Sequence, residues 1–572
     1  MGADRQRRDG AAADAATEPG LVSRRTVLGG LAALGGGALL APGAARAAAD
    51  ASATTRQAAR WQRDPKTLVF AADGSPSDLD PQTSNDYRSI LALLGIYDTL
   101  IALKGDATDE YVPMLAEKWE SNADKSVWTF HLRDGAKFTD GAPVDAAAVL
   151  ASFERLSTQS LGQGESWTRF VSDPKKQITA PDAKTVVFNL GKPQPLFEAA
   201  IAGTYGSYIV NAKAMKDHED NGDWGHAWAQ TNADGTGSGP YKLAAFDPSE
   251  QLTLAKNDDY WGGWDGNHFE QVVIRVVPEN GTRRQLLEQG QVDLVDTLTY
   301  NDLDALKQNP NLTLHAAYTS RIDYLYLTVA GPLKTPEARQ AMNYAFPFDE
   351  GIKGIYKGYG KRAIGPVAEV LRGFDPKTFT YPTDLDKAKA LFAKAGVEPG
   401  TTITMAVEPG DQNVLTLAQL FQANLAKIGM TLTITQMETS SYVGMLYGDA
   451  PADQRPNTMW WAWWPSYNDG WSHLHDLTAC DATGANGGGN AGFYCNPKVD
   501  ALLKQTENAP DEATYNKAMA ELQQILTQDD PPAIYYAQIQ TTLMAQKDIQ
   551  GIVINPINVG TYYFFQMSRT SS

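Results

Sequence analysis

Apolar residues recur along this chain in the two spacings that mark strands and helices. Residues 67–72 are continuously apolar, which is typical of a buried central strand. Helical spacing appears at residues 386–395 and 415–428, and each of these segments leads toward a strand-like stretch, at 402–407 and 431–435. This alternation of helices and strands predicts an α/β fold.

The phrase over residues 112–155 is rich in local signals. Residues 126–132 alternate between apolar and polar, as in a half-buried strand, and a turn signal follows at residues 134–135. Residues 137–138 are expected to begin a return strand and complete a hairpin. Asp145 then stands where its carboxylate would cap a helix N-terminus. The phrase holds no acid, base or metal constellation, so its local chemistry predicts a structural unit.

Residues 1–47 differ from the rest and are expected to be an export signal. Arg24 and Arg25 form a twin-arginine pattern, an apolar run continues to Leu40, and Ala45 opens a small-residue cleavage site. The run is about 15 residues long, short of the roughly 20 that a bilayer span needs. No cysteine follows it to carry a lipid anchor. We therefore expect an exported protein, in the periplasm, outside the cell or at its surface.

The wording of the phrase over residues 112–155 resembles the signature of the extracellular solute-binding proteins of family 5, the peptide- and nickel-binding group of ABC importers. Those proteins carry P-x-L-A-E-x-W, then F-x-L-R-x-G-x-K-F-x-D-G-x-P, then a helix that ends in a Glu-Arg pair. Further family-like phrases occur at residues 236–241, 256–262, 490–503 and 530–536. The matching residues of the first phrase are Pro113, Leu115, Ala116, Glu117, Trp119, Phe130, Leu132, Arg133, Gly135, Lys137, Phe138, Asp140, Gly141, Pro143, Glu154 and Arg155.

The resemblance implies a periplasmic-binding-protein-like α/β fold of type II, cluster C. It would have two main lobes, a small extra lobe and a hinge of crossing strands. A length of 572 residues agrees, because it is too long for one core. A strand over residues 551–554 is expected to help complete the first lobe. The expected division is 60–105, 236–325 and 536–572 for the first lobe, 106–235 for the small second lobe and 326–535 for the third.

The resemblance also implies a function. It indicates the substrate-binding protein of an ABC importer, which captures a small solute between its lobes by hinge closure. The solute would be an oligopeptide or a related compound, delivered to a membrane permease and its ATPase. We expect a monomer without a cofactor. An oligosaccharide or another non-peptide solute is the alternative. A secreted hydrolase is less favoured, because the sequence lacks G-x-S-x-G, G-x-x-x-x-G-K-[ST] and H-E-x-x-H.

The net charge of the chain limits the classes of partner that it is expected to bind. The chain has 49 basic and 67 acidic residues and a net charge of −18. Residues 1–47 hold six arginines and four acids, so their removal makes the rest more negative. This balance argues against nucleic acid or an anionic membrane as a partner.

Only two cysteines are present, Cys480 and Cys495. In an oxidising compartment we expect a disulfide, which would contribute roughly 3 kcal/mol in the chain-entropy model. The resemblance implies the same, because the dipeptide-binding branch of the family has a cysteine pair at the corresponding place. Without CxxC spacing the thiols make a poor metal site. His473, His475 and Asp476 are likewise expected in surface or capping roles rather than as a metal centre.

Residues 458–471 should meet the ligand, because five of their fourteen residues are Trp and a loop dense in aromatics suits a binding wall. In the peptide-binding branch the equivalent loop reads W-x-x-D-Y-x-[DE]-P, and its first Asp holds the ligand's amine. Trp463, Tyr467 and Asp469 fit this pattern. Ser466 stands where that Asp is expected, and Gly470 replaces the Pro.

A neutral hydroxyl cannot make the charge-assisted bond of a carboxylate to an ammonium. Short free peptides are therefore expected to bind weakly unless Asp469 takes over the anchor. Alternatively, the tryptophans stack on a sugar or a cationic ring. The expected ligand-binding residues are Asn85 and Tyr87 from the first lobe, Trp463, Trp464, Ser466, Tyr467 and Asp469 from the third, and Tyr535 and Tyr536 near the hinge.

Overall fold

The structure is a computed structural model and describes residues 64–158, 167–448, 450–483 and 489–570. Contacts divide the chain into residues 1–62 and residues 63–572, and the elements below belong to the second unit. The export signal expected over residues 1–47 lies outside the described residues. Within the described ranges, no helix has both the length and the hydrophobicity that crossing a bilayer requires.

The described chain is a mixed α/β structure with one large sheet of twelve strands, as the alternation of patterns predicts. In its first half, β1 runs parallel to both β10 and β11. Leu68 and Phe70 of β1 are fully buried, so the apolar run does mark a central strand. The first group of elements is β1 (Thr67–Ala72), α2 (Tyr87–Ile96), β8 (Tyr241–Asp247), β9 (Gln251–Lys256), β10 (Gln271–Val276), α9 (Asn280–Glu288), β11 (Leu294–Asp296), α10 (Tyr300–Leu306) and β12 (Leu312–Tyr318).

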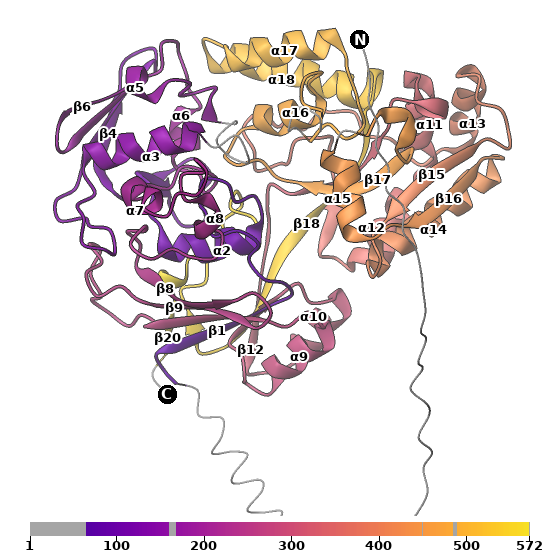
Figure 1. The fold of residues 1–572 in the computed structure, drawn as a ribbon. Coiled ribbons are helices and arrows are strands. Elements are labelled where there is room, and N and C mark those ends of the chain that lie inside the picture. Colours follow the sequence, from indigo (N-terminus) through magenta and orange to yellow (C-terminus); the bar gives the residue numbers. More distant parts are fainter. Residues whose placement is uncertain (1–63, 159–166, 449, 484–488, 571–572) are drawn as a thin grey trace, which may run out of the picture. The chain divides into compact units, whose positions relative to one another are not determined.

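A separate four-stranded antiparallel sheet has the order β4-β5-β7-β6. Phe130 and Phe188 on its strands are fully buried and pack edge to face, with ring centroids 5.6 Å apart. Helices α3, α5 and α6 lie beside this sheet (Figure 1). The second group is β2 (Ile101–Leu103), β3 (Tyr111–Pro113), β4 (Ala116–Ser121), β5 (Val127–Leu132), α3 (Ala146–Thr158), α5 (Pro174–Gln177), β6 (Ile178–Asp182), β7 (Thr185–Asn189), α6 (Phe197–Ile201), α7 (Ala212–Lys216) and α8 (His226–Ala229).

The other half of the large sheet is built from β13 to β17 and is covered by helices. One of these helices, α11, begins at Pro336. The side chain of the preceding residue, Thr335, accepts a hydrogen bond from the backbone N–H of Ala338 and so caps the helix. The third group is β13 (Ile322–Leu327), α11 (Pro336–Ala345), α12 (Phe348–Tyr356), β14 (Gly360–Arg362), α13 (Leu385–Lys394), β15 (Thr402–Val407), α14 (Gln412–Lys427), β16 (Thr431–Gln436), α15 (Thr439–Tyr447), β17 (Thr458–Trp463), α16 (Gly470–Thr478), α17 (Pro497–Glu507) and α18 (Glu512–Gln524).

One strand, β18 (Ala533–Gln546), belongs to both halves of the large sheet. Its residues Ala533–Ala537 pair with β13, and its residues Gln540–Gln546 pair with β12. Figure 1 shows β18 as the long yellow strand that runs between the two halves. The boundary expected between residues 535 and 536 therefore falls inside a strand. The division into three lobes stays a prediction.

Two strand predictions were wrong. Residues 137–138 form only an isolated bridge, Lys137 to Pro143, because the chain reverses at once through Gly141 with φ 89°. The hairpin partner of β5 is instead β4. Residues 551–554 form no strand either. Gly551 has φ 76°, which ends the short β19 (Ile549–Gln550) opposite β20 (Ser568–Arg569). Asp145 caps α3 as predicted, accepting from the N–H of Ala148 at 2.9 Å.

The expected disulfide between Cys480 and Cys495 is present. Cys480 lies two residues beyond α16, and Cys495 lies two residues before α17. The bond therefore closes the connection between these two helices. Part of that connection, residues 484–488, lies outside the described ranges.

Candidate functional site

Strand β17 carries the tryptophan-rich stretch and then releases it as a loop. The strand pairs with β13 on one side and with β15 on the other. Met459 is fully buried, whereas Trp460, Trp461 and Trp463 are partly exposed. Residues 464–469 follow as a loop that leads into α16. The β17–α16 loop is thus held at both ends by regular structure.

Asp469 fixes the far end of this loop. Its carboxylate accepts from the backbone N–H of Trp471 at 2.7 Å, capping α16, and from the Tyr515 hydroxyl at 2.8 Å. It also accepts from the Arg372 guanidinium at 2.8 Å, and Arg372 itself pairs with Glu512. Burial raises the pKa of the Asp469 carboxyl. These bonds engage the carboxylate inside the protein, which argues against a relocated amine anchor.

A small cavity lies between the β17–α16 loop and the second group of elements, and we call it the Arg169 cavity. Its volume is about 30 Å³, enough for about two waters. A larger solute therefore needs the two walls to separate. The second group supplies Trp167, Arg169, Phe170, Ala200 and Tyr205, and the loop with α16 supplies Ser466, Tyr467, Ser472 and Asp476.

Arg169 is the cationic residue of this cavity. Its guanidinium lies over the Trp471 ring, 4.1 Å from the centroid, and Nη1 donates to the Tyr467 hydroxyl at 3.3 Å. Burial raises the pKa of Tyr467, and it raises that of Tyr205 to about 12. Both phenols therefore keep their protons at neutral pH and can act as donors.

Further contacts join the β17–α16 loop to the first and second groups. Trp464 Nε1 donates to the Tyr205 hydroxyl at 3.2 Å, and the Trp464 ring meets the Tyr87 ring edge on, with centroids 6.4 Å apart. Asn468 Nδ2 donates to the carbonyl of Thr108 at 2.8 Å. Segments hundreds of residues apart in the sequence therefore face each other here.

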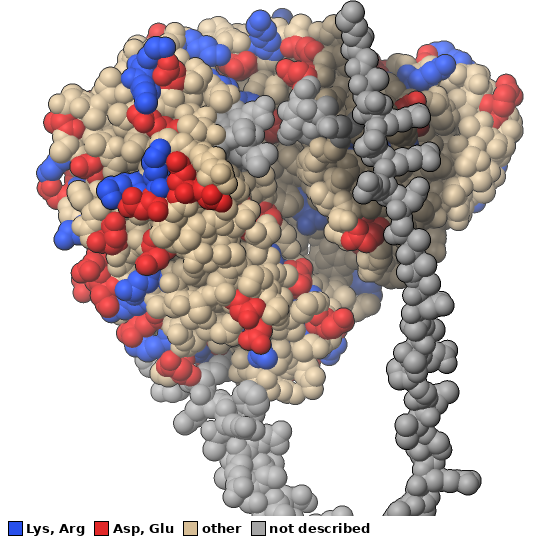
Figure 2. Space-filling model, in the orientation of Figure 1, with Lys and Arg blue, Asp and Glu red and all other residues tan. Residues whose placement is uncertain are grey.

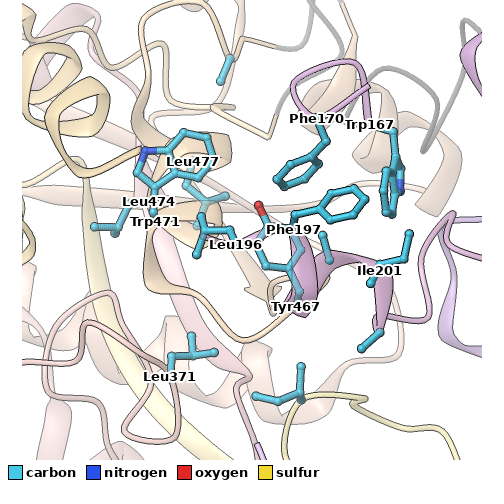
Figure 3. Close-up of a cluster of buried hydrophobic side chains, with 14 of the residues drawn as sticks. Trp167, Phe170, Leu196, Phe197, Ile201, Leu371, Tyr467, Trp471, Leu474 and Leu477 are labelled. Atoms are coloured by element: carbon cyan, nitrogen blue, oxygen red, sulfur yellow. The ribbon is translucent and has the colours of Figure 1, made fainter. Parts of the chain in front are cut away.

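Aromatic packing stiffens the cavity wall. The rings of Phe170 and Phe197 lie 5.9 Å apart between centroids, and those of Phe170 and Tyr467 lie 6.2 Å apart. Figure 3 shows Trp167, Phe170 and Phe197 close together, with Tyr467 and Trp471 on the side of the third group. One hydrophobic cluster includes all five. The charged and hydroxyl groups of the cavity thus stand on a well-packed apolar base.

The other predicted site residues are placed as follows. Asn85 is exposed, and neither it nor Trp463 lines a described cavity. Tyr535 lines two other small cavities, one of about 20 Å³ beside Tyr324. Tyr536 is fully buried, with its ring 5.2 Å from that of Phe346 between centroids. Such burial argues against a direct ligand contact by Tyr536.

The histidines of α16 are not arranged as a metal centre. His473 is fully buried, and burial lowers its pKa to about 4, so the ring is neutral at physiological pH. Nδ1 of His475 lies 3.3 Å from a carboxylate oxygen of Asp476. Across the described part of the chain, no cluster of three or more His, Cys, Asp or Glu side chains could hold a metal ion.

Sequence reasoning missed the wall formed by the second group. Arg169 belongs to the segment Trp167–Phe170, which matches no motif. The available signal was a basic residue between two aromatic ones, a composition that suits a binding wall. Asp476 was expected in a surface or capping role, and Tyr205 was not considered.

Comparison with known proteins decides the family. The profile of the bacterial extracellular solute-binding proteins, family 5 middle region, matches residues 110–485. The chain belongs to this family. This confirms the resemblance seen in the sequence, and it makes the protein a solute-binding protein by family.

Relatives match along most of the family-5 chain. The probable D,D-dipeptide-binding periplasmic protein of Escherichia coli K12 is 30% identical over 506 residues, covering 88% of this chain and 94% of its own. The dipeptide-binding protein of the same organism is 26% identical, with the same coverage. A periplasmic binding protein of Helicobacter pylori, solved with the peptide STSA, has a TM-score of 0.75 at 26% identity, covering 88% and 98%. The predicted periplasmic-binding-protein fold is therefore confirmed.

Proposed function

We propose that this family-5 protein is the exported substrate-binding protein of an ABC importer and that it captures a short peptide or a peptide-related solute. Relatives named for D,D-dipeptides and for dipeptides support this assignment. So does the neighbour solved with a tetrapeptide. We place the solute at the Arg169 cavity, between the β17–α16 loop and the second group of elements.

One observation carries the proposal. The Arg169 cavity has two walls from distant parts of the chain, and the hydrogen bond between Arg169 and Tyr467 spans 298 residues of sequence. Such a concave site with a few polar groups on an apolar base has the composition of a small-molecule site. Its volume of about 30 Å³ is far below that of a peptide. The solute therefore enters when the walls separate, and they close around it by hinge motion.

Gly203 offers a test of closure. A methyl group at Gly203 would lie 2.8 Å from the carbonyl oxygen of Ser466 on the opposite wall. Gly203→Ala should therefore oppose closure and weaken binding of any solute held between the walls, by about 5- to 150-fold for 1–3 kcal/mol of overpacking. Gly281→Ala is the matched control, because a methyl there meets no atom within 4 Å. Equal affinity of the two variants would contradict closure at this site.

The setting of the protein is part of the proposal. The twin-arginine pattern at Arg24 and Arg25 supports export to the periplasm, to the outside of the cell or to its surface. We propose that the loaded protein acts as a monomer and delivers its solute to a membrane permease with an ATPase. We further propose that it catalyses no reaction and needs no cofactor.

A non-peptide solute such as an oligosaccharide is the second candidate, and Ser466 is the observation that favours it. The residue lines the cavity and carries no charge for an amine, while the Asp469 carboxylate is engaged by Trp471, Tyr515 and Arg372. A peptide solute remains the favoured proposal, because the relatives are named for dipeptides.

Native mass spectrometry of the purified protein would first identify any solute that it retains. Calorimetry would then compare a library of di- to pentapeptides with a library of oligosaccharides. Binding of peptides with a dissociation constant below about 100 μM supports the first proposal. Binding of oligosaccharides alone would replace it with the second.

A further inference from the structure

The guanidinium of Arg169 is short of hydrogen-bond partners. It has five N–H donors, and its described contacts are one hydrogen bond to Tyr467 and the face of Trp471. The Trp471 ring is fixed in turn, because its Nε1 donates to the carbonyl of Leu503 at 2.7 Å. The cation is therefore held in place by rigid neighbours that leave most of its donors available.

This situation sets Arg169 apart from other arginines. Among the described residues, each other arginine that is buried or half-buried donates to a carboxylate or to a backbone carbonyl. The carboxylate-bound ones are Arg88, Arg155, Arg284, Arg321, Arg339, Arg372 and Arg569, and the carbonyl-bound ones are Arg133, Arg283, Arg362 and Arg455. Arg169 does neither. The half-buried Arg169 guanidinium is stabilised by the nearby charges of Asp476 and Glu507, and its remaining N–H donors suit an anion supplied from outside.

The rest of the cavity also offers donors. The hydroxyl of Tyr467 accepts from Arg169, and that of Tyr205 accepts from Trp464, so each keeps its own proton for a further bond. Ser466 and Ser472 add two hydroxyl groups. The one carboxylate of the lining is that of Asp476, which lies beside His475 and also attracts the charge of Arg169. Two planar oxygens of a carboxylate would fit the fork of the guanidinium.

We propose that Arg169 binds a carboxylate of the solute and that a free amine is not required. The inference rests on the proposed function and narrows it to carboxylate-bearing peptides and their N-blocked forms. The carboxylate lies on the wall of the second group, opposite Ser466, and the apolar part of the solute packs on the aromatic base. Closure then brings the hydroxyl of Tyr467 to the same anion.

Matched ligand series test the proposal by calorimetry. L-Ala-L-Ala and D-Ala-D-Ala are each used as the free dipeptide, as the N-acetyl derivative and as the C-terminal amide. We expect the first two forms to bind with similar affinity and the amide about 10- to 150-fold more weakly, the range for losing a charge-assisted hydrogen bond. Arg169→Gln should abolish the preference for acid over amide, and Arg169→Lys should keep part of it. Arg275→Gln, an exposed change of the same kind, should keep all of it.

The preference for acid over amide is the decisive quantity, since a purely structural role of Arg169 would weaken both forms alike. Thermal unfolding without ligand checks that each variant folds. Equal binding of acid and amide by the wild type, or an unchanged preference in Arg169→Gln, would overturn the inference while leaving peptide binding intact. Loss of binding on N-acetylation alone would show an amine anchor, with Asp476→Asn as its test, and would also overturn it.

If no peptide of these series or of the di- to pentapeptide library binds, the proposed peptide function fails, and a second panel decides the inference separately. Hippurate and phenylacetate are then compared with their amides. Binding of an acid that is lost in Arg169→Gln supports the carboxylate site. Absence of binding by every acid would overturn it.

Discussion

Asp98 makes the stability of this solute-binding protein depend on pH in an unusual direction. The side chain is 2% exposed, and its Oδ2 accepts from Trp261 Nε1 at 2.7 Å and from the Ser238 hydroxyl at 3.2 Å. Within the described structure its Oδ1 is buried without a hydrogen bond. Burial raises the pKa of this carboxyl from 3.8 to about 7.

The sign follows from the raised pKa. The folded state holds the proton more tightly than the unfolded state, so the contribution of Asp98 to stability is complete below pH 4 and is lost as pH rises toward 7. The change in the pKa of Asp98 from 3.8 to about 7 corresponds to about 4 kcal/mol in all. The part lost between pH 5 and pH 8 is about 2.5 kcal/mol.

Asp98→Asn removes the titration and keeps an acceptor oxygen of similar shape for Trp261. The difference between the free energies of unfolding of the variant and of the wild type should therefore shift by about 2.5 kcal/mol in favour of the variant as pH rises from 5 to 8. Urea unfolding at several pH values measures this, with Asp265→Asn, an exposed site, as the control. A difference between wild type and Asp98→Asn that is the same at pH 5 and pH 8 would refute the reasoning.

Three further predictions concern other parts of the chain. Asp469→Ala removes the cap of α16 and a bond to Tyr515, so it should cost about 2–3 kcal/mol in urea unfolding, and wild-type stability would contradict its structural role. Reduction of the bond between Cys480 and Cys495 should cost roughly 3 kcal/mol; two thiols that alkylate in unreduced native protein would show that no bond forms. Replacing Arg24 and Arg25 by Lys should leave unprocessed precursor inside the cell, whereas normal secretion would mean that the pair is incidental.

Local patterns gave the parts of the fold that depend on neighbouring residues. The run over residues 67–72 became β1 and the run over residues 402–407 became β15, with unchanged bounds, because apolar continuity and flanking turns define such strands. Asp145 caps its helix as predicted. The family resemblance, carried by linear motifs, supplied the fold and the class of function.

The features that the sequence did not predict depend on contacts between residues far apart in the chain. Arg169 and Tyr467 are hydrogen-bonded although 298 residues separate them in the sequence. The residue spacing within either segment does not predict this contact. Asp469 fitted the loop motif by its type, but its bonds to Tyr515 and Arg372 come from separate elements. The predicted return strand failed for a local reason, the tight turn at Gly141, which leaves room for only one bridge.

The strand β18 has a consequence for synthesis. Gln538 donates to the carbonyl of Thr319, 219 residues earlier, and β12 has β18 as its pairing partner in the sheet. At roughly 5–20 residues per second, a nascent chain would wait about 10–45 seconds between making β12 and making its partner. During that interval the backbone groups of β12 form an open edge, the kind of surface on which chains aggregate. Retarding synthesis between these two strands should therefore lower the yield of folded protein more than retarding it elsewhere.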